Sequence, residues 1–206
     1  KIKNISTKFH RSFSGKIKTV TIKKSPSGKY FASILVEEAI SAPIPTLIEQ
    51  DKTLGLDMGI THFCIDSQGN KVGNPKHLLA SLGRLKAEQQ KFSRMKKESH
   101  RRGKQQLKLA VLHETVANKR YDFIHQLSAK LAVENQATSF AVENLHIKGM
   151  VKNHKLARAI NDCGWGLFLN ALSYKCEWNG KNLIKIDRFA ASSKTCSTCG
   201  LKQATL

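Results

Sequence analysis

The chain has 206 residues, enough for one or two domains with a hydrophobic core. Its 35 Lys and Arg residues outnumber its 15 Asp and Glu residues, which gives a formal net charge of +20. This excess predicts a polyanionic partner, nucleic acid in particular, and leaves a ribosomal-type basic protein as an alternative. The sequence has no apolar run of about 18 residues, so it predicts no membrane-spanning helix.

The first predicted elements are a β-hairpin over residues 16–36 and a linker over residues 39–52. The hairpin consists of two runs rich in β-branched and aromatic residues around Ser-Pro-Ser-Gly, which is a turn sequence. Its lysines either face phosphate groups or form the solvated side of the ribbon. Pro43 and Pro45 interrupt both periodicities in the linker.

The central part is predicted to contain a strand over residues 53–58, a hairpin through "DSQGN" at 66–70, and a short strand near Lys71 and Val72. A basic, mostly polar stretch follows. Residues 104–133 then show a helical pattern, with one candidate apolar face. That face is formed by Leu107, Val111, Ala117, Tyr121, Ile124 and Leu131.

The last elements are a strand in "ATSFAVENLHI" (137–147) that ends at Glu143, a helix over 156–178, and a strand over 182–187. This order of strands and helices predicts an α/β fold built on one sheet. The apolar residues of the last helix are Trp165, Phe168, Leu169 and Leu172.

Asp57 and Glu143 are the candidate catalytic residues. Asp57 shares its strand face with Thr53 and Gly55, whose small size leaves the carboxylate open. Glu143 lies in an apolar strand, where we expect a buried charge to need a cation. Two-metal phosphodiester chemistry uses carboxylates that converge on ions about 4 Å apart, and Mg²⁺ or Mn²⁺ prefers such oxygen ligands. A turn residue at Asp57 and a surface residue at Glu143 remain alternatives.

A second candidate metal site is the pair Cys196 and Cys199 in "KTCSTCGLK". The C-x-x-C-G spacing is typical of a zinc knuckle, and the pair would supply two of the four ligands of a tetrahedral site. A redox pair or a chance occurrence remains open. Cys176 and His154 lie at irregular distances and are not assigned as ligands.

The basic segment 84–120 is the candidate nucleic-acid surface. Its cations would follow phosphate groups without reading sequence, or would form a solvated helix face. Phe92 and Met95 are too few to make a stacking platform. The residues assigned to nucleic-acid binding are Arg94, Lys96, Lys97, Arg101, Arg102, Lys104, Lys119 and Arg120.

Five stretches, in the same order, resemble the OrfB/TnpB family of insertion-sequence proteins, which are described as probable transposases and are similar to type V CRISPR effectors. The hairpin sequence "GKIKTVTIKKSPSGKY" resembles the end of the family's oligonucleotide-binding β-domain. The five stretches span about residues 53–200 and read "LGLDMGITHFCIDSQGN", "KRYDFIHQLSAKL", "FAVENLHIKGM", "CGWGLFLNALSYKCEWNGK" and "SSKTCSTCG".

The resemblance implies a RuvC-like fold of the RNase H type, an α/β domain with a mixed sheet, over residues 50–189. Part of a small β-domain would precede it (1–49), and the first half of a zinc ribbon would follow (190–206). Asp57 matches the family's first catalytic aspartate and Glu143 its glutamate, as ligands of Mg²⁺ or Mn²⁺. Cys196 and Cys199 would bind structural Zn²⁺.

The implied activity is cleavage of a double-stranded DNA target directed by a guide RNA from the element, in the cytoplasm of a bacterium or archaeon. The chain departs from the family because the third catalytic aspartate lies in a segment after the second cysteine pair, which this sequence does not contain. Asp162 and Asp187 match non-catalytic positions. A chain that begins at Lys1 and ends soon after one cysteine pair is expected to be truncated at both ends.

Two functions therefore remain in view. The first is a transposon-encoded, RNA-guided DNA endonuclease, present here as a central fragment that we expect to be inactive alone. The second is a nucleic-acid-binding remnant that regulates its element without chemistry. A ribosomal-type protein explains the charge, but it explains neither the paired carboxylates nor the cysteine pair.

Overall fold

The computed structural model of the chain describes residues 8–10, 12–39 and 41–187. These residues divide into two compact units. One unit combines the described residues before Ala42 with Glu88–Glu114, and the other combines Ala42–Ala87 with the described residues from Thr115 onward. Helices α1 (His77–Arg94) and α2 (His100–Ala129) each run from one unit into the other. Cys196 and Cys199 lie outside the described residues.

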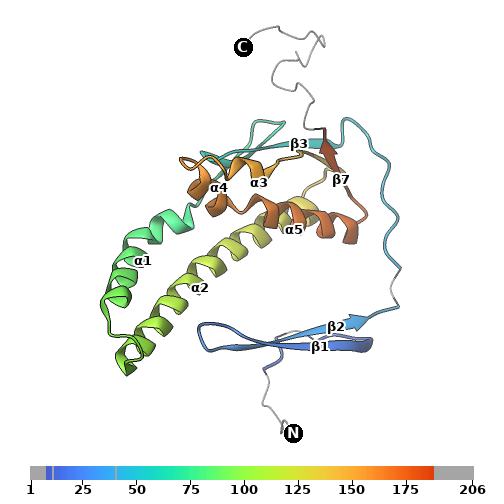
Figure 1. Ribbon diagram of the computed structural model, residues 1–206. Coiled ribbons are helices and arrows are strands. Elements are labelled where there is room, and N and C mark those ends of the chain that lie inside the picture. Colours follow the sequence, from blue (N-terminus) through green and yellow to red (C-terminus); the bar gives the residue numbers. More distant parts are fainter. Residues whose placement is uncertain (1–7, 11, 40, 188–206) are drawn as a thin grey trace. The chain divides into compact units, whose positions relative to one another are not determined.

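Figure 1 shows the elements along the chain. The strands are β1 (Lys16–Lys24), β2 (Tyr30–Glu37), β3 (Thr53–Met58), β4 (His62–Asp66), β5 (Lys71–Gly73), β6 (Ser139–Glu143) and β7 (Asn182–Ile186). The helices are α1 and α2, the π-helical end of α2 named η1 (Lys130–Glu134), α3 (Ile147–Met150), α4 (Ala157–Cys163) and α5 (Trp165–Trp178).

The larger unit is built on a five-stranded mixed sheet in the order β5-β4-β3-β6-β7. Strands β3, β4 and β5 are antiparallel neighbours, whereas β6 runs parallel to both β3 and β7. The predicted turn at 66–70 is confirmed, because the Asp66 carboxylate accepts hydrogen bonds from the backbone N–H groups of Gln68 and Asn70. The parallel pairs instead require long helical crossovers.

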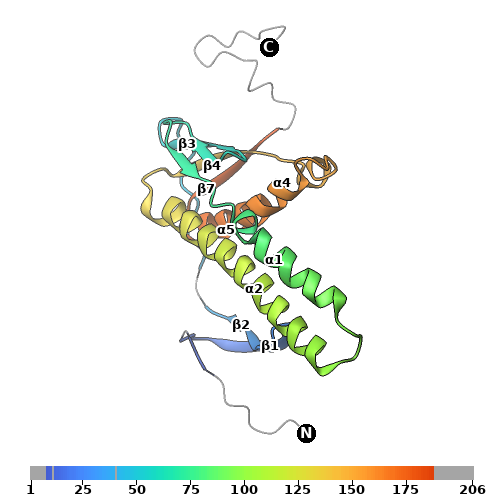
Figure 2. The ribbon, with the colours of Figure 1, turned by 90° about the vertical axis from the view of Figure 1, so that its left-hand side faces the viewer.

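Helices α2 and α5 pack against one face of this sheet (Figures 1 and 2). The alternation of strand residues sends Leu54, Leu56 and Val142 to that face, where they are buried. Phe63 of β4 meets the ring of Phe168 of α5 edge-to-face, with the ring centroids 5.2 Å apart. The predicted α/β arrangement with a mixed sheet is confirmed.

The predicted helix 156–178 is wrong as one continuous element. Gly164 separates α4 from α5 with a φ of +69°, a left-handed conformation that glycine adopts readily. A Cβ at Gly164 would lie 2.9 Å from Cδ of Arg120, so the close approach of α2 also favours glycine. Trp165, Phe168 and Leu172 are buried as expected.

The helix predicted over 104–133 begins earlier, at His100, and the sequence pattern missed α1 altogether. The predicted buried face of α2 is only partly correct. Leu107, Val111 and Tyr121 are exposed, while Ile124 and Leu131 are buried. Among the buried residues that the prediction left out are Leu109, Val116 and Leu127. None of the helices in the described residues combines the length and apolar character needed to cross a bilayer.

The smaller unit contains the predicted hairpin, in which β1 and β2 pair antiparallel. Its turn closes through a hydrogen bond from the Gly28 N–H to the Ser25 carbonyl. Two of its lysines pair with acids, Lys18 with Glu37 at 2.6 Å and Lys29 with Glu114 at 2.9 Å. The hairpin surface is therefore less positive than its lysine content suggests.

Candidate metal site and nucleic-acid surface

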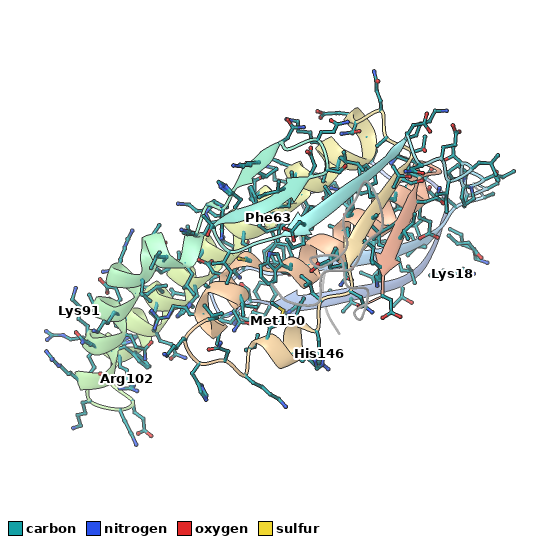
Figure 3. All side chains as sticks on the ribbon, turned by 90° about the horizontal axis from the view of Figure 1, so that it is seen from above. Lys18, Phe63, Lys91, Arg102, His146 and Met150 are labelled. Carbon is teal, nitrogen blue, oxygen red and sulfur yellow. The ribbon has the colours of Figure 1, made fainter. Side chains whose placement is uncertain are left out.

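The pairing of β3 with β6 brings Asp57 and Glu143 together. Leu56 is opposite Val142 in the parallel register, and Asp57 and Glu143 are the next residue on each strand. Side chains alternate across a sheet, so both carboxylates belong to the face opposite the one that carries Leu56 and Val142. That second face is the one seen in Figure 3, with the strands in front of α2 and α5.

Both carboxylates are exposed, which confirms that the small neighbours of Asp57 leave it open. The expectation that Glu143 is buried is wrong, because β6 ends at this residue and its side chain reaches solvent. The position of Glu143 therefore does not require a cation to neutralise a buried charge. Burial is the main reason why the pKa of the Cys64 thiol is raised to about 11, and the nearby charges of Asp66 and Asp57 also raise it.

Within the described part of the chain, neither carboxylate has a hydrogen-bonding or ion-pairing side-chain partner. Two like charges held side by side on neighbouring strands favour a shared cation. Carboxylate oxygens are the ligands that Mg²⁺ and Mn²⁺ prefer, so these residues fit such an ion. No set of three or more His, Cys, Asp or Glu residues within the described ranges could hold a metal.

The structure places three cysteines, and all are buried thiols. Burial raises the pKa of Cys176 to about 11, which disfavours the thiolate that binds metal. His154 is exposed on the connection between α3 and α4. Within the described residues, neither position belongs to a group of three or more potential metal ligands.

The predicted nucleic-acid-binding residues fall into two groups. Six are exposed and form no ion pair within the described residues, whereas Arg102 and Arg120 are half-buried with specific partners. The six exposed cations are Arg94 at the end of α1, Lys96 and Lys97 in the connection, and Arg101, Lys104 and Lys119 on α2.

Arg120 holds three elements together. Its Nε donates to the carbonyl of Asp162 at 2.9 Å, and its NH2 group lies 3.2 Å from the Asp162 carboxylate. That carboxylate also accepts hydrogen bonds from the backbone N–H groups of Leu78 and Leu79, and it therefore caps the start of α1. This contact could not be predicted from the sequence, because Asp162 is distant from α1 along the chain.

A second acid neutralises cations on the helix pair. Glu88 of α1 is 7% exposed and accepts hydrogen bonds from Gln105, Lys108 and Lys91. These hydrogen bonds lower the pKa of Glu88 to about 2, and the one from Gln105 has the largest effect. Lys91 and Lys108 therefore have a local counter-ion that the six exposed cations lack.

The fold and these sites define a class: a mixed α/β protein with paired acidic side chains on its sheet and a strongly basic pair of helices. The OrfB_IS605 family, described as "Probable transposase", matches residues 33–154. The chain belongs to this family. A second family, described as "Cas12f1-like, TNB domain", matches residues 165–205.

Several known proteins are similar to this chain in sequence. A "Putative RNA-guided DNA endonuclease" of Streptomyces pristinaespiralis is 40% identical over 189 residues, which are 91% of this chain and 45% of the relative. InsQ of Escherichia coli, with the same description, is 28% identical over 205 residues, 92% of this chain and 49% of that protein. The chain thus spans less than half the length of these relatives.

Two solved structures share the fold. One is a cryo-EM structure of a CRISPR-Cas12f ternary complex, with a TM-score of 0.51 and 20% identity over 84% of this chain and 34% of that one. The other is a cryo-EM structure of a Cas12f1–sgRNA–target DNA complex, with a TM-score of 0.50 and 15% identity over 93% of this chain and 59% of that one.

Proposed function

We propose that this chain is the central part of an RNA-guided DNA endonuclease that hydrolyses phosphodiester bonds at a RuvC-like site of the RNase H type. The observation that carries the proposal is the β3–β6 register, which brings Asp57 and Glu143 side by side on an exposed sheet face. The names of the sequence relatives support the same activity. Because the chain spans less than half of those relatives, the proposed activity is that of the longer protein.

Asp57 and Glu143 would hold Mg²⁺ or Mn²⁺. A bound divalent ion supplies Lewis-acid activation of water and of the scissile phosphate. The two residues lie at the ends of adjacent parallel strands, and both side chains are exposed. The rigid sheet thereby fixes the separation of the ligands, while the open face leaves room for a phosphate backbone. The third carboxylate that the family resemblance implies is not matched in this sequence.

The rest of the chain would serve binding. We propose residues 1–49 as part of an oligonucleotide-binding β-domain, 50–189 as the incomplete nuclease domain, and 190–206 as the first half of a zinc ribbon. Cys196 and Cys199 would bind Zn²⁺ there. The partners would be a guide RNA and double-stranded DNA, with the exposed cations of α1 and α2 contacting phosphates.

The test uses the protein encoded by the complete reading frame, with its guide RNA and a matching DNA duplex. We expect Asp57→Asn and Glu143→Gln each to lower the cleavage rate by at least about 10³-fold, as expected for loss of a metal ligand, and to leave RNA binding within about twofold. Asp51→Asn, which changes an exposed aspartate just before β3, is the matched control and should cleave like the wild type.

Chelation of divalent ions should abolish cleavage, and Mg²⁺ should restore it. Wild-type cleavage rates in Asp57→Asn would show that this carboxylate is no ligand. Tight RNA and DNA binding by the wild-type protein without metal-dependent cleavage would instead favour the non-catalytic binding function.

A further inference from the structure

Arg101 and Arg102 are adjacent and chemically identical, yet the structure gives them different environments. Arg101 is exposed and forms no hydrogen bond or ion pair through its side chain within the described residues. Arg102 is half-buried, and its NH1 group donates to the carbonyls of Phe92 and Met95, both at 2.9 Å. Figure 3 labels Arg102 near the end of the helix pair.

The Arg102 side chain joins the end of α1 to the start of α2. Its guanidinium carbon lies 4.0 Å from the centroid of the Phe92 ring, a cation–π distance. The two carbonyls that it binds belong to the last turn of α1 and to the residue directly after it, where a positive charge is favourable. The Arg102 side chain therefore makes its contacts with the end of α1 and the connection between the helices.

The connection itself is short and ordered by further contacts. The Ser99 hydroxyl accepts a hydrogen bond from the Arg102 N–H at 3.2 Å, as an N-cap of α2, and donates to the Lys96 carbonyl at 2.9 Å. Glu98 adopts a φ of +63°, which is uncommon for a residue with a side chain. A backbone in this conformation needs support from surrounding contacts.

Five exposed cations that form no ion pair within the described residues lie in or beside this connection. We call the set Arg94, Lys96, Lys97, Arg101 and Lys104 the basic tip. Glu98 is the only acid between residues 94 and 104. Farther along the helices, Lys91 and Lys108 are neutralised by Glu88. The basic tip is thus a cluster of five such cations beside the backbone that Arg102 fixes, while others, such as Arg84 and Lys119, lie farther along the helices.

We propose that the basic tip contacts nucleic-acid phosphates and that Arg102 is its positioning residue, which shapes the tip without contacting phosphate. This inference rests on the proposed nucleic-acid-binding function and deepens it. It also separates two residues that the sequence placed in one group. Because the tip is ordered before binding, the entropy of fixing it is not lost when phosphate binds.

The experiment measures the affinity of the 206-residue chain for a fluorescent DNA duplex of about 20 base pairs as a function of salt, without divalent metal. Arg101→Ala should lower the slope of log affinity against log salt by about 0.9, the value for one lost phosphate contact. The same variant should lose about eightfold in affinity at about 0.1 M salt. Amide hydrogen exchange of residues 92–99 should not change.

Arg102→Ala should accelerate the amide exchange of residues 92–99. It should also lower the affinity roughly tenfold, because binding would then have to order about one more residue. The slope of log affinity against log salt should change by less than half as much as in Arg101→Ala. Phe92→Leu removes the stacked ring while every cation stays in place. It should lower affinity about two- to fivefold at an unchanged slope. This second variant keeps the proposal testable if Arg102→Ala does not fold.

An Arg102→Ala variant with the slope of Arg101→Ala and unchanged exchange would show that Arg102 contacts phosphate directly, and would overturn the proposal. Wild-type affinity in Arg101→Ala, or no duplex binding by the wild-type chain, would overturn the role of the tip. None of these results depends on cleavage. The Asp57 and Glu143 test can therefore succeed or fail independently.

Discussion

The carboxylates of Asp57 and Glu143 are expected to repel each other in the metal-free protein. Neighbouring strands lie about 4.8 Å apart, so carboxylates on the same face at matching positions are about 5 Å apart. Both are exposed, so the dielectric constant of water applies, and Coulomb's law gives about 0.8 kcal/mol of repulsion. Screening leaves about 0.7 kcal/mol at 0.01 M salt and about 0.2 kcal/mol at 1 M.

A double-mutant cycle measures this repulsion. The chain carries a net charge of +20, so either Asp57→Asn or Glu143→Gln also removes attraction to distant cations. The cycle cancels that contribution and isolates the pair. Free energies of unfolding come from urea titrations followed by the fluorescence of Trp165, which is 2% exposed in the core. We expect an unfavourable coupling near 0.7 kcal/mol at low salt that largely disappears at high salt.

Mg²⁺ should reverse the sign of the effect. At ten times its dissociation constant, an ion that binds only the folded protein adds about 1.4 kcal/mol to the free energy of unfolding. Either single replacement should remove most of this gain. Strictly additive variants at low salt, together with no stabilisation of the wild type by Mg²⁺, would refute the placement of the two carboxylates.

Three further predictions concern the packing and the ion pairs. Phe168→Ala should cost about 3–5 kcal/mol of unfolding free energy in urea titrations, since the ring is fully buried in the core. Asp162→Asn should cost about 3 kcal/mol in the same assay, because it leaves the partly buried charge of Arg120 unpaired, whereas the exposed Asp122→Asn should change stability by less than about 0.5 kcal/mol. The Glu88 pKa is lowered from its ordinary value of 4.5 to about 2, so its stabilisation is present above pH 4.5 and is lost as the pH falls toward 2. Acid titrations of the unfolding free energy should therefore show the wild type and Glu88→Gln converging over that window.

Each of these three predictions has a result that would contradict it. Wild-type stability in Phe168→Ala would place the ring outside the core. Equal losses in Asp162→Asn and Asp122→Asn would mean that the contact with Arg120 contributes nothing. A difference between Glu88→Gln and the wild type that stays constant from pH 6 to pH 2 would rule out the hydrogen-bonded carboxylate.

The strands around the carboxylates could be predicted because their side-chain pattern is local. Alternating apolar residues define β3, and the Asp66 turn follows from its own sequence. The pairing of β3 with β6 could not be obtained in this way, since nothing local sets a parallel register. That register is what makes Asp57 and Glu143 neighbours.

The helices show where local patterns fail. The α1 sequence is mostly polar, so its few leucines gave no clear period, and its start depends on the remote carboxylate of Asp162. The break at Gly164 was missed because a single glycine within an apolar pattern is compatible with a continuous helix. Arg101 and Arg102 could not be distinguished, because only the fold of the connection separates their environments.

The parallel pairing of β3 and β6 also bears on how the chain folds. More than 80 residues separate Asp57 from Glu143. Closing so long a loop costs about 2–3 kcal/mol more free energy, through lost chain entropy, than closing a hairpin. The β3–β4–β5 meander can therefore form early, while the edge of β3 stays unpaired until β6 has been synthesised and docked. During translation the carboxylate pair is assembled late, so a nascent chain would expose a strand edge that is open to aggregation before Asp57 and Glu143 become neighbours.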